Sequence, residues 1–303
     1  MAYNSVTKTG GRAMSARMAT RTVLTMVACG VSLLMADTPK MKPVLTVPHE
    51  LDVLLKSGHI QGACCSEQGV YLSHQLGIDK IGWDGKLIKH VDAPAHLGDS
   101  AYADGKIYGA FVIRDKKDRK DGKMGLVRVW DEDLNQLNEA WFDEALDGIV
   151  VLNGTVYVGV DRWGSKPHPL CCVKRLDLNL KDLGNTDVDL GYDIHYGVQT
   201  MGTDGKDLIF GNYGGTSVVS ADLKTNRKVA FGCAEGLGLV PKSVTKSDAK
   251  VFFVVQAMGG NMQGWRKDPI WREDPMKNPN PPRIRLNFFE YKDGRFVNVT
   301  DKL

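Results

Sequence analysis

Short runs in which apolar and polar residues alternate recur along the chain from about residue 58 to its end. The runs are rich in Val, Ile, Tyr and Phe, and Gly or Asp-Gly turns separate them, as in VYLSHQ, KIYGAFVIR and TVYVGVDRW. This period of two predicts β-strands. No segment keeps a helical period, although LNEAWFDEALDG (137–148) fits either a short helix or a fourth strand with a linker.

The strand-like runs fall into five cycles, which cover residues 59–91, 96–142, 146–184, 195–232 and 240–300. Each cycle holds four runs, and the third run ends in an Asp-bearing turn such as WDG (83–85) or YKDG (291–294). Four-stranded units with a period of roughly 40 to 50 residues predict an all-β, five-bladed β-propeller of four-stranded antiparallel blades.

The spacing of His and Tyr residues supports one register for the cycles. His59 precedes Tyr71 by 12 residues, and His96 precedes Tyr108 by the same 12. Counting 12 back from Tyr157 reaches a position two residues before Asp147. In a propeller, the polar residues at these starts of first strands converge on the central channel.

The N-terminus resembles an export signal. Three Arg residues precede the uncharged apolar stretch VLTMVACGVSLLMA (23–36), which is short for a membrane span. We therefore expect a signal peptide over 1–36, a segment leading into the propeller over 37–57 and the propeller over 58–303. The mature chain is expected to have no transmembrane span and to be exported, either to a periplasm or outside the cell.

The charge balance argues against a nucleic-acid partner. The chain has 39 basic and 36 acidic residues, and its one dense basic run (116–123) is interleaved with Asp, which is typical of a solvated hairpin loop. After removal of Cys29 five cysteines remain, and none has zinc-site spacing. Buried thiols are expected, with a bridge from Cys64/Cys65 to Cys171/Cys172 as the alternative.

Candidate site residues are found by their place in the blade. Loops that enter the first strand and loops that join the second and third strands share one face of a propeller, and loops commonly carry function. The starts of the first strands hold His59, Gln61, His96, Asp99, Asp147, His195, Gln199 and Lys242. Their imidazoles and carboxylates could act as acid and base or hydrogen-bond channel water, and His59, His96 and His195 could bind a divalent metal.

The loops between second and third strands add candidate substrate-binding residues. Arg pairs with carboxylates and exposed aromatic rings stack on sugars, although Trp265 could instead pack on its own blade. The residues concerned are His74, Gln75, Arg114, Arg162, Trp163, His168 and Tyr213, together with Trp265 in the long segment 256–282.

The first blade resembles that of the plant-type glutaminyl cyclotransferases, which are exported five-bladed propellers. Gln61-Gly62 before a strand and YLS at 71–73 carry the resemblance, but Ala63 and Cys64 replace the acidic residue that follows in that family. The chain also resembles the five-bladed furanosidases, in which carboxylates surround the axis. That resemblance implies such roles for Asp99, Asp147 and Glu235, whereas the His-rich axis departs from it.

These observations predict an exported enzyme that acts on a carbohydrate or related small polar substrate, as a glycoside hydrolase or lyase. The expected catalytic residues are His59, His96, Asp99, Asp147 and His195. The alternative is a non-catalytic propeller that binds a glycan or a protein through its Trp-bearing face. A third reading is a structural propeller whose axial His residues hold a metal for stability alone.

Overall fold

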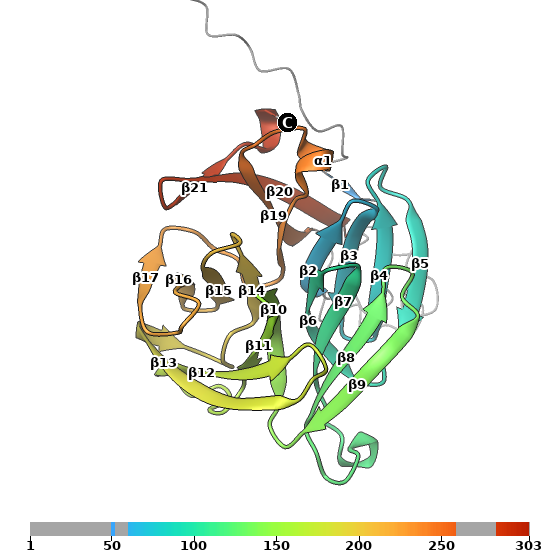
Figure 1. The fold of residues 1–303 in the computed structure, drawn as a ribbon, viewed down its shortest axis with the longest axis vertical. Helices are drawn as coiled ribbons and strands as arrows, with labels where there is room; N and C mark the ends of the chain where they lie inside the picture. Colours follow the sequence, from blue (N-terminus) through green and yellow to red (C-terminus); the bar gives the residue numbers. More distant parts are fainter. Residues whose placement is uncertain (1–49, 52–59, 259–282, 303) are drawn as a thin grey trace, which may run out of the picture. The chain divides into compact units, whose positions relative to one another are not determined.

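Five antiparallel sheets surround a centre in this computed structural model, which describes residues 50–51, 60–258 and 283–302 (Figure 1). The chain is therefore an all-β, five-bladed β-propeller, as the repeats predicted. The innermost strands β2, β6, β10, β14 and β18 contact one another around the ring.

Each of the first four blades is a simple four-stranded meander. Blade 1 contains β2 (Ile60–Ser66), β3 (Gly69–His74), β4 (Gly77–Gly82) and β5 (Leu87–Asp92). Blade 2 contains β6 (His96–Ala103), β7 (Lys106–Val112), β8 (Gly125–Asp131) and β9 (Gln136–Phe142), with the short η1 (Lys116–Asp118) between β7 and β8. Blade 3 contains β10 (Leu146–Leu152), β11 (Thr155–Val160), β12 (His168–Asp177) and β13 (Asp182–Ile194). Blade 4 contains β14 (Thr200–Thr203), β15 (Leu208–Asn212), β16 (Gly215–Val219) and β17 (Asn226–Val229).

Blade 5 is built from both ends of the described chain. It contains β18 (Leu237–Leu239), α1 (Lys242–Thr245), β19 (Lys250–Met258), β20 (Arg283–Lys292) and β21 (Arg295–Asn298), and η3 (Thr300–Lys302) follows. The outer edge of β20 pairs with two strands. β21 places Asn298 opposite Phe289, and β1 (Glu50–Leu51) places Leu51 opposite Ile284.

Asp-Gly and Asn-Gly pairs form the tight turns that the sequence pattern indicated. Asn153 and Gly154 both have positive φ angles, 51° and 74°, between β10 and β11. Two successive positive φ angles belong to the type I′ turn, whose twist matches that of a hairpin, and Asn followed by Gly adopts it readily. The strand period and the turns together therefore specify the blades.

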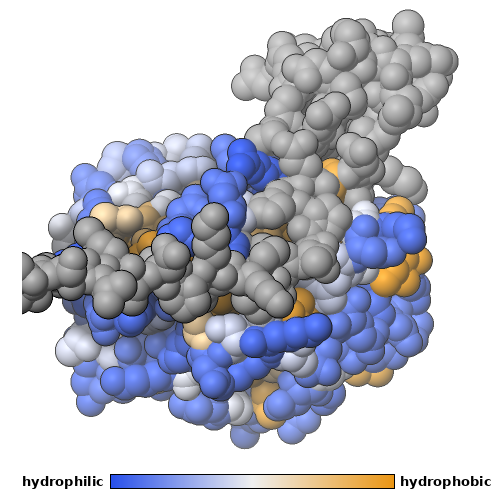
Figure 2. All heavy atoms as spheres, turned by 90° about the horizontal axis from the view of Figure 1, so that it is seen from above, coloured by the Kyte–Doolittle hydropathy of each residue, from blue (hydrophilic) through white to orange (hydrophobic). Residues whose placement is uncertain are grey.

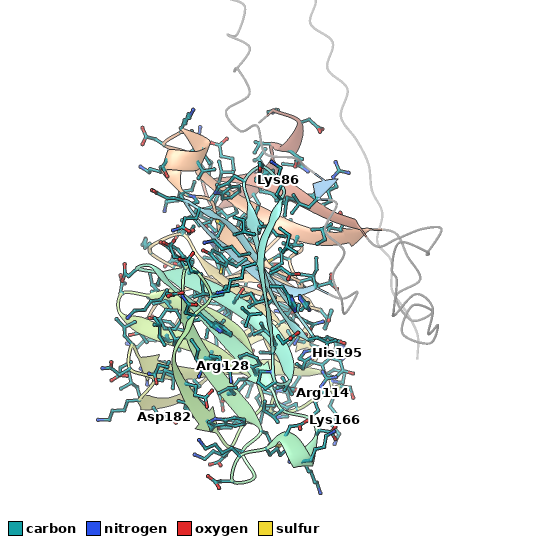
Figure 3. All side chains as sticks on the ribbon, turned by 90° about the vertical axis from the view of Figure 1, so that its right-hand side faces the viewer. Lys86, Arg114, Arg128, Lys166, Asp182 and His195 are labelled. Carbon is teal, nitrogen blue, oxygen red and sulfur yellow. The ribbon has the colours of Figure 1, made fainter. Side chains whose placement is uncertain are left out.

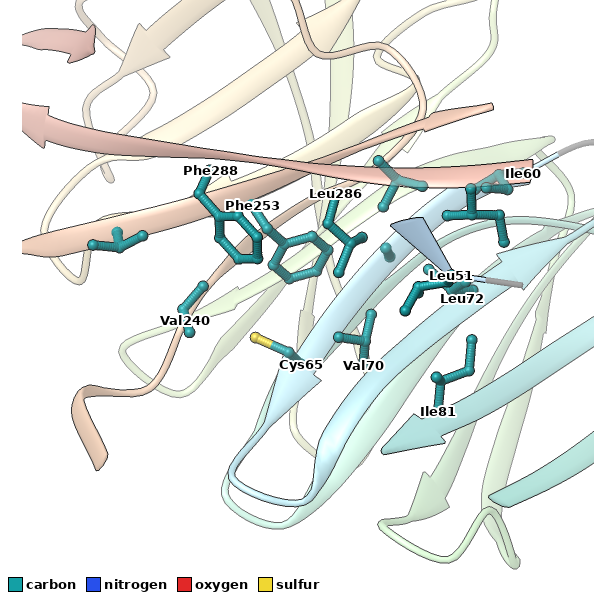
Figure 4. Close-up of a cluster of buried hydrophobic side chains, with 14 of the residues drawn as sticks. Leu51, Ile60, Cys65, Val70, Leu72, Ile81, Val240, Phe253, Leu286 and Phe288 are labelled. Carbon is teal, nitrogen blue, oxygen red and sulfur yellow. The ribbon is translucent and has the colours of Figure 1, made fainter. Parts of the chain in front are cut away.

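The core consists of five apolar clusters, one at each interface between neighbouring blades. Figure 4 shows the cluster that joins blade 5 to blade 1, where Phe253 and Leu286 lie near Cys65.

Tyrosines of second strands add hydrogen bonds between blades. The Tyr71 hydroxyl donates to the carbonyl of Glu132 at 2.9 Å, and the Tyr157 hydroxyl donates to the carbonyl of Ala221 at 3.0 Å.

Some local features agree with the sequence pattern and others depart from it. Residues 137–148 form the end of β9 and the start of β10, not a helix. The basic run is mostly exposed, and the five described cysteines are free and buried, as expected. Blade 3 was expected to end at Gly184, but its last strand continues to Ile194.

No helix among residues 50–51, 60–258 and 283–302 is long and apolar enough to cross a bilayer. The face drawn in Figure 2 is largely hydrophilic where its residues are coloured, with small separate apolar patches.

Candidate functional site at the channel mouth

A polar cavity of about 410 Å³ opens where the first strands of blades 1 to 4 begin. Four of its lining residues come from the starts of first strands, and the others come mainly from connections between second and third strands. Lining residues are Gln61, Gln75, His96, Val112, Arg114, Asp147, Asp161, Tyr196, Gln199 and Tyr213. One cavity therefore brings together residues that the sequence singled out by their place in the blade, namely Gln61, Gln75, His96, Arg114, Asp147, Gln199 and Tyr213.

β-Bulges in three first strands set the direction of the axial side chains. The register of β2 shifts between Ile60 and Gly62, that of β6 between Leu97 and Ser100, and that of β10 between Leu146 and Ile149. A bulge inserts a residue and turns neighbouring side chains out of the regular alternation, which is common beside functional sites. Gln61, Asp99 and Asp147 all lie within these bulges.

Asp147 is the buried carboxyl group of the cavity. Gln199 Nε2 donates to its Oδ2 at 3.1 Å and also donates to the Tyr196 carbonyl at 2.8 Å. Burial raises the pKa of Asp147 well above its ordinary value, and the neighbouring carboxyl groups of Asp99 and Asp161 raise it further. Asp147 therefore favours its protonated form more strongly than an exposed aspartate does, and it lies at the wall of a polar cavity.

Asp99 lies in the bulge of β6, one residue further along the bulge than Asp147 lies in that of β10. The Asp99 side chain is fully buried. Its Oδ2 accepts hydrogen bonds from the backbone N–H of Met201 at 2.7 Å, the hydroxyl of Thr200 at 3.1 Å and the backbone N–H of Ile149 at 3.3 Å. Its Oδ1 has no hydrogen-bond partner among the described residues. Burial raises the pKa of Asp99 to about 8, so the carboxyl joins blades 2, 3 and 4 in its neutral form.

Glycines of the preceding blade make room for both carboxyl groups. A Cβ added at Gly98 would collide with Oδ1 of Asp147, and one added at Gly62 would collide with Oδ1 of Asp99. Each carboxyl group therefore lies directly over the backbone of the neighbouring first strand. The glycines of the segments LGD (97–99) and QG (61–62) therefore shape the site as well as the bulges.

Aromatic and cationic groups surround the mouth. Tyr196 and Tyr213 meet edge to face with ring centres 6.3 Å apart, and they are 45% and 52% exposed. Burial, followed by the charges of Glu235 and Asp147, raises the pKa of Tyr213, and burial raises that of Glu235. The positive charge of Arg114 lowers the pKa of Asp147 and so partly opposes the effect of burial. Arg114 lies on the same side of the molecule as His195 (Figure 3).

Other predicted residues lie outside the lining of this cavity. The Nδ1 of His195 lies 3.0 Å from the carbonyl oxygen of Ser165. Trp163 stacks on His168 with ring centres 4.2 Å apart and packs against the core. Arg162 donates to Asp187 and lies over the Trp163 ring. These three aromatic and cationic side chains are therefore engaged with one another and with their own blade.

Lys242 does not lie at the start of a first strand, and that expectation was wrong. The first strand of blade 5 is the short β18 (Leu237–Leu239), so Lys242 follows it, in α1. Its ammonium group is exposed and pairs with Asp248 at 3.0 Å. His59 and Trp265 lie outside the described residues. His74 is buried in the sheet of blade 1, where it meets Asp79 and His90.

Sequence reasoning missed Asp161 and Tyr196. Asp161 directly follows β11, one residue before Arg162, so its place in the blade was a usable signal. Its Oδ1 accepts the backbone N–H of Gly164 at 2.8 Å. Tyr196 follows His195 and has a positive φ of 59°, a backbone conformation that the sequence pattern did not predict.

A metal held by His96 and His195 receives no support from the described residues. Among these residues the one group of three ligand side chains close enough to share an ion is His74, Asp79 and His90, away from the cavity. His59, the third member of the expected axial set, lies outside the described residues.

Comparisons with known proteins find distant structural likenesses. No protein-family model and no curated protein sequence matches the chain. Among solved structures, glutaminyl cyclase of Myxococcus xanthus matches with a TM-score of 0.49 at 9% identity, over 80% of this chain and 98% of that one. A protein of unknown function from Bacteroides caccae matches with a TM-score of 0.44 at 12% identity, over 80% and 83% of the two chains. Likenesses this distant carry no argument about activity.

Proposed function

We propose that the chain is an exported enzyme that acts on a carbohydrate or related small polar substrate, as a glycoside hydrolase or lyase. The observation that carries the proposal is Asp147, a buried carboxyl with a raised pKa that lines a polar cavity of about 410 Å³. That volume falls within the range of about 300–1,000 Å³ that small-molecule sites have. Perturbed carboxyl groups in such cavities are candidate acids and bases.

The proposed chemistry uses groups that differ in protonation. Asp147 supplies a proton to the leaving oxygen, and Gln199 holds its Oδ2 in place. Pairs of titratable groups whose surroundings separate their pKa values commonly divide acid and base roles. His96, on the wall of the same cavity, is the proposed base. Asp99 is not among the residues that line the cavity.

The substrate class follows from the remaining lining. Arg114 suits a carboxylate, and Gln61, Gln75 and Gln199 suit hydroxyl groups. Tyr196 and Tyr213 provide ring faces and edges for a pyranose or furanose ring. A uronic acid or an oligosaccharide that contains one fits this combination, and removal of its α-proton would make β-elimination the lyase reaction.

The direct test is turnover of a panel of neutral and uronic-acid oligosaccharides by the purified protein and by Asp147→Asn. Cyclisation of an N-terminal glutaminyl peptide is measured alongside, because of the resemblance of blade 1. We expect one carbohydrate to be cleaved and Asp147→Asn to lose at least a hundredfold in kcat, as removal of a general acid does. Asp248→Asn, a change at a fully exposed carboxylate, is the control. Full activity in Asp147→Asn would reject the assigned site.

A non-catalytic glycan-binding or protein-binding propeller is the second candidate, and the exposed Tyr196–Tyr213 pair favours it. In that case no substrate is turned over, binding survives Asp147→Asn, and binding is lost in Tyr196→Ala and Tyr213→Ala. Isothermal titration with the same oligosaccharides separates the two candidates.

Export remains part of the proposal. The predicted signal peptide over 1–36 implies that the mature chain begins near Asp37. N-terminal sequencing of the protein recovered from the periplasm or the medium tests this. An intact Met1 on cytoplasmic protein would contradict export.

A further inference from the structure

Three side chains from the outer strands of blade 1 converge on one point, away from the channel. His74 ends β3, Asp79 lies within β4 and His90 lies within β5. One potential ligand atom from each lies within 4.8 Å of the other two. The pairing of β4 with β5, which sets Asp79 opposite His90, creates this arrangement.

The carboxylate of Asp79 lies between the two imidazoles. Its Oδ1 is 2.6 Å from His90 Nδ1, and its Oδ2 is 3.4 Å from His74 Nε2. The two rings are nearly parallel, at 13°, with centres 5.7 Å apart. Each carboxylate oxygen therefore faces a different imidazole nitrogen.

Gly77 provides the space in which both rings lie. A Cβ at this position would come within 2.7 Å of His90 Cε1 and 3.2 Å of His74 Cε1. It would also meet the carbonyl oxygen of Val91 at 2.6 Å. The absence of a side chain at Gly77 is therefore a condition for the observed placement of the imidazoles.

Burial and an outer carboxylate complete the arrangement. The side chains of His74 and Asp79 are 0% and 5% exposed, whereas that of His90 is 19% exposed and gives access from solvent. The other nitrogen of His90, Nε2, lies 3.0 Å from Oδ1 of the exposed Asp92. A carboxylate on the far nitrogen of a ligating His fixes the orientation of the ring and its tautomer.

We propose that His74, Asp79 and His90 form a binding site for a divalent transition-metal ion of the Zn²⁺ class. Two imidazoles and one carboxylate are a donor set that zinc and related metals accept, with a further position left for water. None of the three residues lines the channel-mouth cavity, and the proposal does not depend on the proposed function.

The side chains must move closer together when a metal binds. With metal–ligand bonds of about 2.0–2.2 Å, the ligand atoms of a tetrahedral site lie roughly 3.4 Å apart. The 3.4 Å distance from His74 runs to Asp79 Oδ2 and the 2.6 Å distance from His90 runs to Oδ1, so Asp79 must turn until one oxygen serves as the ligand. The three ligand atoms, which lie within 4.8 Å of one another, must then approach by up to about 1.4 Å. The long 3.4 Å contact from Leu76 N–H to His74 Nδ1 must be given up when the metal binds Nε2. The bound ion would link β3, β4 and β5.

The test uses the full-length protein, stripped with EDTA and then titrated with ZnCl₂ by calorimetry and with CoCl₂ by visible absorption. We expect one tight site per chain, Co²⁺ bands typical of four or five ligands, and a higher Tm with Zn²⁺. Asp79→Asn and His90→Gln should weaken Zn²⁺ binding at least a hundredfold, and Asp92→Asn about tenfold or more.

His168→Gln and His195→Gln are the matched controls. His168 lies in blade 3 and His195 in the turn that follows it, so both variants should bind Zn²⁺ as the wild type does. Circular dichroism of each metal-free variant verifies folding, and the Co²⁺ spectrum of the wild type tests the donor set without any substitution. Absence of a tight site in the wild type would overturn the proposal. So would Zn²⁺ binding that Asp79→Asn and His90→Gln leave unchanged.

Discussion

The carboxyl group of Asp99 accepts the backbone N–H of Met201 at 2.7 Å, across the centre of the ring from blade 2 to blade 4. The same oxygen also accepts hydrogen bonds from Thr200 and Ile149. One buried side chain therefore connects three blades, and its protonation state affects how well the ring holds together.

Asp99 should make the stability of the protein fall as pH rises. Burial raises its pKa to about 8 in the folded protein, from an ordinary value of 3.8. The native state thus keeps a proton that the unfolded chain loses. The stabilisation is complete below about pH 4 and is lost as pH rises through 8, with a slope of about 1.4 kcal/mol per pH unit in between.

Calorimetric unfolding of the wild type and Asp99→Asn between pH 4 and 9 measures this dependence. Asp147 contributes in the same direction in both proteins, so the difference between them reports Asp99. An identical pH slope in the two proteins would show that Asp99 is ionised when folded. Asp99→Ala, which removes the acceptor of three hydrogen bonds, should cost about 3 kcal/mol at low pH.

Gly98→Ala should disturb Asp147 without removing it. A methyl group at Gly98 would occupy the position of Asp147 Oδ1, and overpacking of this kind costs about 1–3 kcal/mol. We expect a lower Tm together with weaker ligand binding or lower turnover. Gly232→Ala is the control, because an added Cβ there meets nothing within 4 Å. Equal behaviour of the two variants would mean that the carboxyl group does not need this space.

Gln199→Ala should move the alkaline limb of the pH–rate profile to higher pH. The Gln199 amide donates to Asp147 Oδ2 and thereby favours the ionised carboxylate, so its loss raises the pKa of Asp147 further. The measurement is kcat/KM against pH, or carbonyl infrared titration of Asp147. Gln68→Ala, on a distant turn, should leave the profile in place. A shift to lower pH would contradict the assignment.

Tyr71→Phe and Tyr157→Phe should each destabilise the protein by about 1 kcal/mol, because each loses a hydrogen bond to the next blade. For a domain of this size the Tm should fall by roughly 2–4 °C. Tyr108→Phe is the matched control, since the Tyr108 hydroxyl makes no such bond to the residues that the structure describes. A change in Tyr108→Phe as large as in the other two would remove the hydrogen bonds as the explanation.

Much of the architecture could be predicted from sequence because strand alternation and Asp-Gly turns are local signals. Blade 5 was the exception. Its first strand is only three residues long (LGL, 237–239), too short to show a period, so the segment after Val240 was taken for that strand and Lys242 was misplaced. Blade 3 was also underestimated, because the exposed end of β13 carries few apolar residues.

The site was partly predictable for a related reason. His96, Asp147 and Gln199 were found because the starts of first strands meet at the axis of any propeller. The bulges direct Asp99 toward its buried hydrogen-bond donors and Asp147 toward the cavity. Bulges depend on the register between paired strands, and the sequence pattern does not reveal that register. The cluster of His74, Asp79 and His90 was missed for the same reason, since its members meet only through the registers of β3, β4 and β5.

The pairing of Leu51 with Ile284 has a kinetic consequence. Blade 5 needs β1 from one end of the described chain and β20 and β21 from the other. Contacts so distant in sequence form late, because the loop they close is long. Until then the edge of β20 and the apolar side of blade 1 are both exposed and open to pairing with another chain. Refolding at high protein concentration should therefore yield dimers that have exchanged β1, and dilution should suppress them.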